Sequence, residues 1–288
     1  MNKIVVGLGE ILWDVFPERK ILGGAPANFA FHASQFGLHG YAVSAVGNDL
    51  LGQEILDNLK EKKLNYRIEK TDFPTGTVQV TIDEIGNPKY EICENTAWDN
   101  IPFTKNTEDI AKNTHTVCFG SLAQRGNVSR ETIRKFLAAM PENSLKIFDI
   151  NLRQHYYNKE LIEESLKLSN MLKLNEEEIV AVNRLFEWNI SEEDACKKLQ
   201  NDYHIDILVL TKGTDGSYVY HNKGISFLNT PKVRVIDTVG AGDAFTGAFT
   251  AAIMQDESIE RAHRLAVDVA AFVCTQQGAM PKIPYCFR

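Results

Sequence analysis

Short apolar runs alternate with longer amphipathic segments along most of the chain, and this alternation constrains the fold more than any other feature. The apolar runs have the length of buried strands, and the amphipathic segments have the length and periodicity of helices. The order predicts a three-layer α/β/α fold, in which helices cover both faces of a doubly wound, mostly parallel sheet. Strands are expected at residues 4–8, 41–46, 116–119, 146–150, 171–174 and 207–210, and helices at 26–36, 52–63, 130–140, 161–169 and 191–200.

Residues 75–92 interrupt this order. Their sequence, TGTVQVTIDEIGNPKYEI, alternates apolar and polar residues around the turn signal Gly86-Asn87-Pro88. This pattern is typical of a hairpin, and no helix follows it. We expect the hairpin to pair with the short runs at 12–16 and 20–22.

The hairpin and its partners are predicted to form a small sheet that leaves the main one. We interpret the chain as a single domain over 1–288, with a lid made by segments near 12–22 and 75–100. Ligands in sheets of this class bind outside the carboxyl ends of the strands, and a lid there would exclude water. The alternative is an edge hairpin with no functional role.

Charge and cysteine content exclude several classes of protein. The 31 Lys and Arg residues against 38 Asp and Glu residues give a net charge of −7, which argues against a nucleic-acid partner. The 5 cysteines are widely spaced, so reduced thiols are expected. The N-terminal apolar run is broken by Gly9, Glu10 and Asp14 and is interpreted as a first strand. With no run near the ~20 apolar residues of a membrane span, we expect a cytoplasmic protein without a membrane partner.

The segment VIDTVGAGDAFTGAF at 235–249 carries the strongest chemical signal. Gly240, Ala241 and Gly242 permit a sharp turn that opens a helix of small residues. The first N–H groups of a helix have no intrahelical partner, so they favour an anion such as phosphate. Asp243 lies in this turn and is a candidate general base for an attacking hydroxyl. The alternative is that Asp243 only caps the helix.

Several polar residues follow the predicted strands or precede the predicted helices. Asp14 and Asn28, with Gly24 beside them, offer hydrogen bonds to a polyol, although a tight turn and a solvated carboxylate would look the same. Arg153 follows a strand and suits a phosphate or a sugar, unless it forms a surface ion pair.

The sequences NEEE at 175–178 and TKGTDG at 211–216 also follow strands. A carboxylate in the first could hold Mg²⁺ through water, or it could reflect the acids common at helix N-termini. The second is typical of a loop at the edge of a nucleotide site. There is no G-x-x-x-x-G-K-[ST] sequence, and Leu12 stands where the third glycine of G-x-G-x-x-G belongs, which disfavours a P-loop protein and an NAD-dependent enzyme.

Taken together, the segments resemble the ribokinase-like (PfkB) carbohydrate kinases over almost the whole chain. The resemblance is carried by GGAPANFAFHASQFG, AVGNDLLGQEIL, FDINLR, NEEE, LTKGTDG, DTVGAGDAF and QGAMPKIP in this order. The GEILWDVFP, TGTVQV and AWDNI sequences look most like those of fructokinases. The resemblance implies a ribokinase-like fold with ATP and Mg²⁺ as cofactors.

The resemblance also implies roles for matching positions. Asp243 would be the base, and Gly240, Ala241 and Gly242 would form the anion hole. The sugar would be held by Asp14, Gly24, Asn28 and Arg153, and covered by lid residues Tyr90 and Ile92. Asn175 and Glu178 would organise Mg²⁺ and phosphate, with Glu178 acting through water, while Thr211, Lys212, Gly213 and Gly216 would lie along ATP.

Many relatives bind K⁺ beside the anion hole. The matching positions are Asp237, the Val239 carbonyl and carbonyls near Val273 and Gly278. Lys282 stands where some ribokinases have a small hydroxyl residue, so its ammonium either takes the place of K⁺ or points to solvent. K⁺ dependence is therefore left open.

The resemblance predicts an ATP-dependent kinase that phosphorylates a primary hydroxyl of a monosaccharide. Fructose is the preferred substrate, with ribose, 2-keto-3-deoxygluconate or a nucleoside as alternatives, and O1 and O6 are not distinguished. A non-catalytic sugar-binding sensor is disfavoured because Asp243 and the glycine turn are retained. Relatives often form homodimers through their lid sheets, for which TVQVTI offers an apolar face, unless that face packs on its own chain.

Overall fold

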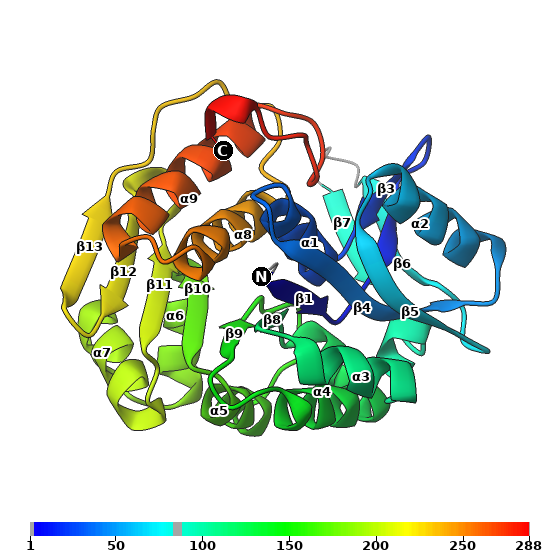
Figure 1. The fold of residues 1–288 in the computed structure, drawn as a ribbon, viewed down its shortest axis with the longest axis horizontal. Coiled ribbons are helices and arrows are strands. Elements are labelled where there is room, and N and C mark those ends of the chain that lie inside the picture. The colour runs from blue at the N-terminus through cyan, green and yellow to red at the C-terminus, as the bar shows by residue number, and fades with distance from the viewer. Residues whose placement is uncertain (1–2, 83–87, 288) are drawn as a thin grey trace.

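The computed structural model describes residues 3–82 and 88–287, which form two β-sheets and the helices around the larger one (Figure 1). The larger sheet has 9 strands in the order β13-β12-β11-β10-β9-β8-β1-β4-β5. Seven neighbouring strands, β11, β10, β9, β8, β1, β4 and β5, are parallel to one another. Beyond β11, β12 runs antiparallel to β11, and β13 runs antiparallel to β12. The strands are β1 (Ile4–Leu8), β4 (His39–Gly47), β5 (Asn65–Thr71), β8 (Thr116–Phe119), β9 (Leu145–Asp149), β10 (Met171–Asn175), β11 (Ile207–Thr211), β12 (Ser217–His221) and β13 (Gly224–Leu228).

Helices cover both faces of the large sheet, as the strand–helix alternation predicts. One apolar core lies beneath α1, α2, α8 and α9, and a second lies beneath α3 to α7 on the opposite face (Figure 1). The predicted three-layer α/β/α fold is therefore confirmed. The helices are α1 (Ala25–Ser34), α2 (Leu50–Glu61), α3 (Lys105–Asn113), α4 (Asn127–Ala139), α5 (Lys159–Leu168), α6 (Glu176–Leu185), α7 (Glu192–Tyr203), α8 (Ala241–Met254) and α9 (Ile259–Cys274).

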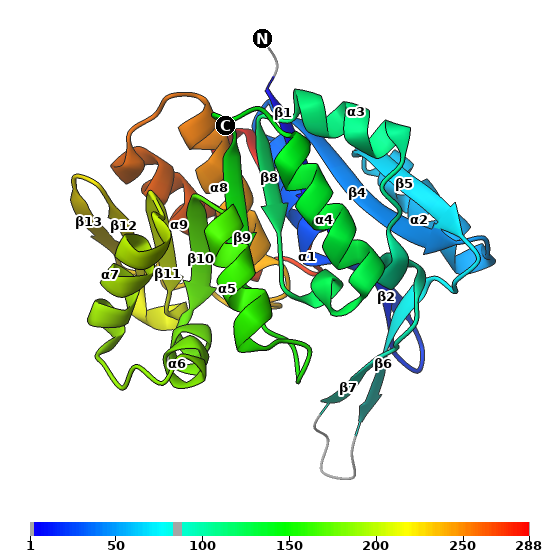
Figure 2. The same cartoon turned by 90° about the horizontal axis from the view of Figure 1, so that it is seen from below.

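A separate sheet has 4 strands in the order β3-β2-β6-β7. Figure 2 shows its β6–β7 hairpin projecting beyond the helices and the large sheet. We call these strands the small sheet: β2 (Leu12–Val15), β3 (Lys20–Gly23), β6 (Gly76–Ile82) and β7 (Pro88–Ile92). The hairpin pairs with the predicted run at 12–16 (β2), whereas the run at 20–22 (β3) joins the same sheet by pairing with β2 and does not contact the hairpin strands directly in the ladder; Pro88 begins β7. Gly86 and Asn87 of the predicted turn lie outside the described residues.

The two sides of β6 differ in burial. Val78 and Val80 are buried against other parts of the same chain, whereas Gln79 and Thr81 are exposed. Val78 and Val80 are thus covered within the chain, which agrees with the alternative to dimerisation. A homodimer through the small sheet stays a prediction.

Arg125 connects the small sheet to the large domain. Its guanidinium lies 4.1 Å from the ring centre of Trp98 and 4.5 Å from that of Tyr156, and its Nε donates to Asp99 over 2.7 Å. Its Nη2 donates to the carbonyl of Cys93, just after β7, over 2.6 Å.

Within the part of the chain that the structure describes, no helix is long and apolar enough to cross a membrane.

Candidate active site

The turn before α8 is built as the glycine-rich sequence predicts. Gly240 is the N-cap of α8 with φ +78°, a left-handed conformation that glycine adopts without strain. A Cβ atom there would lie 2.7 Å from the Cα of Ala279, so the turn also needs glycine for close packing. Asp243 is the third residue of α8 and not its cap, and the alternative capping role is therefore wrong. Its carboxyl lies in the first helical turn, among N–H groups that favour an anion.

Asp243 contacts Asn28, which lies 215 residues earlier in the sequence. The Asn28 Nδ2 donates a hydrogen bond of 2.8 Å to the Asp243 Oδ2. Asn28 lies near the start of α1, which begins after Gly24 at φ +123° with Pro26 in its first turn. The two glycine-rich segments that the sequence singles out are thus brought to one place, at the carboxyl edge of the parallel strands.

The surroundings of Asp243 set its protonation. The pKa of Asp243 is raised to about 6, mainly by burial and in smaller part by the nearby Asp149 carboxylate. Lys173, the hydrogen bond from Asn28 and Arg153 act in the opposite direction. A carboxylate with this pKa is ionised at neutral pH and is still basic enough to accept a proton in a transition state.

Lys173 is a site residue that sequence reasoning missed. Its Nζ lies 3.0 Å from the Asp149 Oδ1, and both side chains are about nine-tenths buried. A Cβ atom on Gly242 would lie 3.1 Å from this Nζ, so the ammonium sits beside the first turn of α8. Burial is the largest single effect and would lower the pKa of Lys173, but the Asp149, Glu178 and Asp243 carboxylates together outweigh burial and raise the pKa above its usual range. The signal was a lysine inside the apolar strand MLKLN.

Glu10 was also missed as a site residue. It follows β1, is 3% exposed, and burial raises its pKa to about 7. It lines a small cavity of about 10 Å³ together with residues of α1 and of the ends of β8 and β9. The sequence analysis treated Glu10 only as a polar interruption of the N-terminal apolar run.

Among the predicted sugar-binding residues, Asp14 and Arg153 are close enough for their charges to interact. Asp14 lies on β2 and is half-buried; burial raises its pKa to about 6, while Arg153 lowers it. The Arg153 side chain is exposed and forms no ion pair within residues 3–82 and 88–287, so the alternative surface ion pair is not seen. Of the two predicted covering residues on β7, Tyr90 is 51% exposed and Ile92 is 8% exposed.

Asn175 and Glu178 cap helix α6. The Asn175 Oδ1 accepts from the backbone N–H groups of Glu177 and Glu178, each over 2.9 Å. The Glu178 carboxylate accepts from the N–H of Asn175 over 2.8 Å and from that of Leu152 over 3.0 Å. These contacts realise the helix-terminus alternative, and they leave further lone pairs on the carboxylate. No group of three or more His, Cys, Asp or Glu residues that could hold a metal is found in the described ranges.

The loop after β11 lies beyond this cluster. Thr211 ends β11, and the Lys212 Nζ pairs with Glu192 over 2.8 Å. Gly213 at φ +49° and Gly216 at φ +107° make the turn, and the Lys212 N–H donates to the Gly216 carbonyl over 2.9 Å. None of these contacts reaches Asp243.

The predicted K⁺ segment joins two loops. The Asp237 carboxylate accepts from the N–H groups of Val239 and Gly278, each over 3.0 Å. The Val273 carbonyl, at the end of α9, accepts from the Gln276 N–H over 2.9 Å. Lys282 is exposed, which agrees with the alternative that its ammonium points to solvent.

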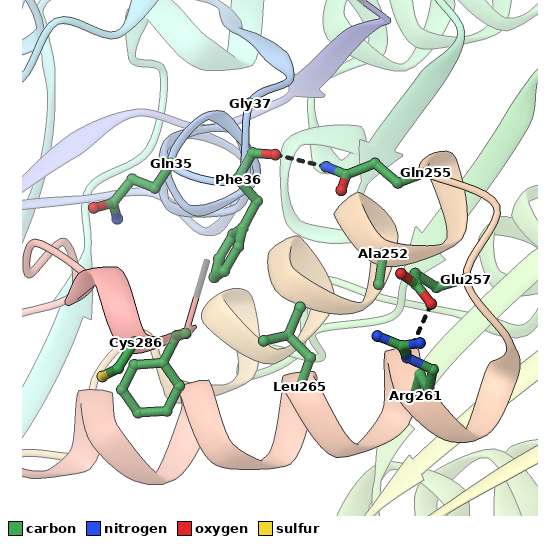
Figure 3. A pocket seen from close by; sticks show the side chains of 10 residues that line it. Gln35, Phe36, Gly37, Ala252, Gln255, Glu257, Arg261, Leu265 and Cys286 are labelled. Atoms are coloured by element: carbon green, nitrogen blue, oxygen red, sulfur yellow. Dashed lines mark hydrogen bonds and ion pairs between the residues drawn. The ribbon is translucent and has the colours of Figure 1, made fainter.

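A second cavity, of about 460 Å³, lies far from the strand ends (Figure 3). It is lined by the C-terminal ends of α1 and α8, by α9 and by the C-terminal segment, and no predicted site residue contributes to it. Figure 3 shows an ion pair between Arg261 and Glu257 at its edge, with a distance of 3.0 Å.

Comparison with known proteins decides the family. The model of the pfkB family of carbohydrate kinases matches residues 10–286. The chain belongs to this family. It is similar to an uncharacterized sugar kinase of Pyrococcus horikoshii, at 27% identity over 96% of this chain and 91% of that protein. It is also similar to a 5-dehydro-2-deoxygluconokinase of Bacillus anthracis, at 27% identity over 92% of this chain and 83% of that protein.

Solved structures support this assignment. The Pyrococcus horikoshii sugar kinase superposes with a TM-score of 0.81 at 26% identity, covering 96% of this chain and 94% of that chain. A fructokinase of Vibrio cholerae, solved with fructose, ADP and calcium ion, superposes with a TM-score of 0.82 at 25% identity, covering 99% and 96%. The predicted membership of the PfkB carbohydrate kinases is confirmed, and the finer likeness to fructokinases is shared with other kinases of the family.

Proposed function

We propose that this carbohydrate kinase transfers the γ-phosphoryl group of ATP to a primary hydroxyl of a neutral monosaccharide, with fructose as the preferred sugar. The observation that carries the proposal is the Asn28–Asp243 hydrogen bond of 2.8 Å at the start of α8. It places a carboxylate in the first turn of a helix whose N–H groups suit the transferred phosphoryl group.

The mechanism requires positioning and charge more than covalent chemistry. Phosphoryl transfer passes through a loose transition state, so orientation and electrostatic stabilisation supply most of the catalysis. Asp243 orients the sugar hydroxyl and accepts its proton, and Asn28 fixes the rotamer of the carboxylate. The N–H groups around Gly240, Ala241 and Gly242 hold the negative charge that develops on the phosphoryl group. The Lys173 ammonium beside Gly242 adds a positive charge next to this turn.

The residues around α6 fit a metal that is held mainly by the phosphates of the nucleotide. The Glu178 carboxylate is buried and fixed by two backbone N–H groups, so its free lone pairs have a set direction. Mg²⁺ keeps several waters and binds few protein carboxylates when phosphates are present, so Asn175 and Glu178 would hold it through water. Bound Mg²⁺ would neutralise charge on the phosphates, and Thr211, Lys212, Gly213 and Gly216 would lie along ATP.

The loops tied by Asp237 fit a monovalent cation. A carboxylate offers about four lone-pair sites, and two of those of Asp237 accept N–H groups. The remaining sites and the Val239 carbonyl would hold K⁺. The exposed ammonium of Lys282 does not take its place in this proposal.

The sugar is selected by the carboxyl groups at the strand ends. Asp14 on the small sheet suits two hydroxyls, and Asn28 suits another. With Glu10 and Asp149 near Asp243, carboxyl groups outnumber the cations Arg153 and Lys173, so a neutral sugar is favoured over a sugar acid. The fructose-bound Vibrio cholerae fructokinase supports this choice. The remaining alternatives are ribose, a nucleoside and 2-keto-3-deoxygluconate.

The test measures ADP release from ATP with fructose, ribose, 2-keto-3-deoxygluconate and a nucleoside. We expect the highest kcat/KM with fructose. Asp243→Asn should lower kcat at least ~10²-fold, the size of a general-base effect, and leave ATP binding measured by calorimetry unchanged. Asp202→Asn, on the exposed part of α7, is the control. Turnover of Asp243→Asn near the wild-type rate would contradict the role of the base, and sugar binding without ADP release would indicate a sensor.

A further inference from the structure

Glu10 is a buried acid just beyond the carboxyl end of an interior strand of the large sheet. It follows β1, which lies between β4 and β8, and its side chain is 3% exposed. Its Oε2 has no hydrogen-bond partner within the part of the chain that the structure describes. A buried polar atom without a partner destabilises a fold, so its presence calls for a functional explanation.

The free oxygen belongs to a residue that lines the cavity at the strand ends. The walls come from three other elements: Ala25 and Pro26 of α1, the end of β8, and Asp149 and Asn151 at the end of β9. Asn28, which contacts Asp243, lies in the first turn of the same helix α1. Glu10 therefore shares a cavity with Asp149, which neighbours Lys173 and Asp243 in the candidate active site.

The charged groups that act on Glu10 are Asp243 on α8, Asp149 on β9 and Arg153 after β9. The pKa of Glu10 is raised to about 7, mainly by burial and in smaller part by the carboxylates of Asp243 and Asp149. Its own backbone N–H and the Arg153 guanidinium oppose the rise. Near neutral pH a large share of Glu10 is protonated, and a protonated carboxyl both donates and accepts a hydrogen bond.

We propose that Glu10 is a specificity-determining residue that hydrogen-bonds a sugar oxygen from the floor of the active site. The carboxyl O–H donates to this oxygen, and its second oxygen accepts from a neighbouring hydroxyl. The pair of contacts suits a neutral polyhydroxy sugar, because each hydroxyl both donates and accepts. This inference rests on the proposed function and extends it to a residue outside the glycine-rich segments.

Two substitutions separate hydrogen bonding from packing. Glu10→Met keeps a similar volume without polar atoms, and we expect the fructose KM to rise about tenfold, which corresponds to the loss of about 1.4 kcal/mol. The ATP KM should stay close to that of the wild type, and the melting temperature should not fall, because Met leaves no buried polar atom without a partner. Glu10→Gln keeps a donor and an acceptor and should hold the fructose KM within about threefold at pH 6.5. Glu69→Gln on β5 is the matched control.

The pH dependence of the fructose KM distinguishes a hydrogen bond to the sugar from a purely structural role, because a structural role of Glu10 would not change it. Between pH 6.5 and 8.5 the wild-type fructose KM should rise as the carboxyl loses its proton, whereas Glu10→Gln should show no such rise. A Glu10→Met variant with an unchanged fructose KM would overturn the inference. So would equal losses for fructose and ATP with a lower melting temperature, or a wild-type KM that is flat over this range.

Failure of the kinase proposal can be told apart from failure of this inference. If the wild type releases no ADP with any sugar, fructose dissociation constants from calorimetry replace KM in the same comparison. A tenfold weaker constant for Glu10→Met would then support the contact while the kinase proposal fails. Normal turnover with no effect of Glu10 would do the reverse, and an absence of fructose binding would overturn both.

Discussion

Asp243 combines two opposing properties in one residue. Its buried carboxylate suits proton transfer near neutral pH, and the same burial makes the ionised form unfavourable in the folded protein. The pKa in the fold is about 6, against 3.8 for an unperturbed aspartate. Between these values the folded state binds more protons than the unfolded state. The free energy of unfolding therefore falls as pH rises from about 4 to 6, and the loss is complete above pH 6.

Asp243→Asn should therefore stabilise the protein where Asp243 is ionised. One pKa unit corresponds to about 1.4 kcal/mol, so we expect a gain of about 1 to 3 kcal/mol at pH 7.5 and a much smaller gain at pH 4. Urea unfolding at both pH values measures this difference. A variant that is less stable than the wild type at pH 7.5 would show that the ionised carboxylate is held by favourable contacts instead.

At the scale of single residues, the sequence predicts a functional role for residues that stand in glycine-rich segments. Asp243 and Asn28 stand beside glycines, and glycines mark turns where a ligand can approach. Glu10 and Lys173 could not be found in this way, because each is a single polar residue beside or inside an apolar strand. Their role depends on Asp149 and Asp243, which come from other elements.

The contact between β1 and α1 shows how elements fix the position of Asn28. A Cβ atom on Gly7 would lie 1.8 Å from the Pro26 carbonyl oxygen, so glycine in β1 lets the first turn of α1 pack directly on the sheet. Asn28 follows Pro26 by two residues. The position of its amide relative to Asp243 is thus set by backbone packing.

Gly7→Ala should move α1 away from the sheet. Overpacking of this kind costs about 1 to 3 kcal/mol, and the displaced Asn28 should lower kcat as well. Denaturant unfolding and kcat measure the two effects. Gly37→Ala is the control, because a Cβ atom there meets no other group within 4 Å and only the strain at φ +87° is added. Loss of stability without loss of kcat would contradict the link between this contact and Asn28.

Element boundaries were predicted where burial makes the pattern simple. The central strands are apolar throughout, and strands 4–8 and 116–119 have the predicted limits. Strand β5 was not predicted, because it lies at the edge of the sheet and its sequence NYRIEKT is half polar. The antiparallel β12 and β13, at the opposite end of the sheet, were not predicted either. A strand at the edge of a sheet, such as β5 or β13, needs fewer apolar residues, so its pattern is weaker.

At the scale of the whole molecule, the strands of the small sheet form a sheet separate from the 9-stranded sheet of the large domain. The alternation in 75–92 predicted the pairing of the hairpin, because each side of the small sheet has its own polarity. The sequence could not predict how this sheet is fastened, because Arg125 lies 26 residues from Asp99 and 32 from Cys93. Such contacts exist only after the two parts have packed.

Arg125→Met tests whether this fastening positions the small sheet as a lid over the sugar. The Arg125 and Asp99 side chains are each 8% exposed. Removal of the arginine leaves the buried Asp99 carboxylate without its partner and should lower the free energy of unfolding by about 3 kcal/mol. Because Asp14 is on the small sheet and the ATP loops are not, the sugar KM should rise while the ATP KM stays constant. Asp99→Asn added to Arg125→Met should recover part of the stability, since no unpaired charge then remains.

Arg134→Met removes an arginine whose pair with Glu164 is more exposed, and this control should change stability by less than about 1 kcal/mol. If the sugar and ATP KM values of Arg125→Met rise together, the Arg125 contacts support the large domain as a whole, and they do not hold the small sheet as a separate lid. If only the sugar KM rises, the same buried arginine joins the stability of the fold to the affinity for the substrate, because both depend on where the small sheet sits.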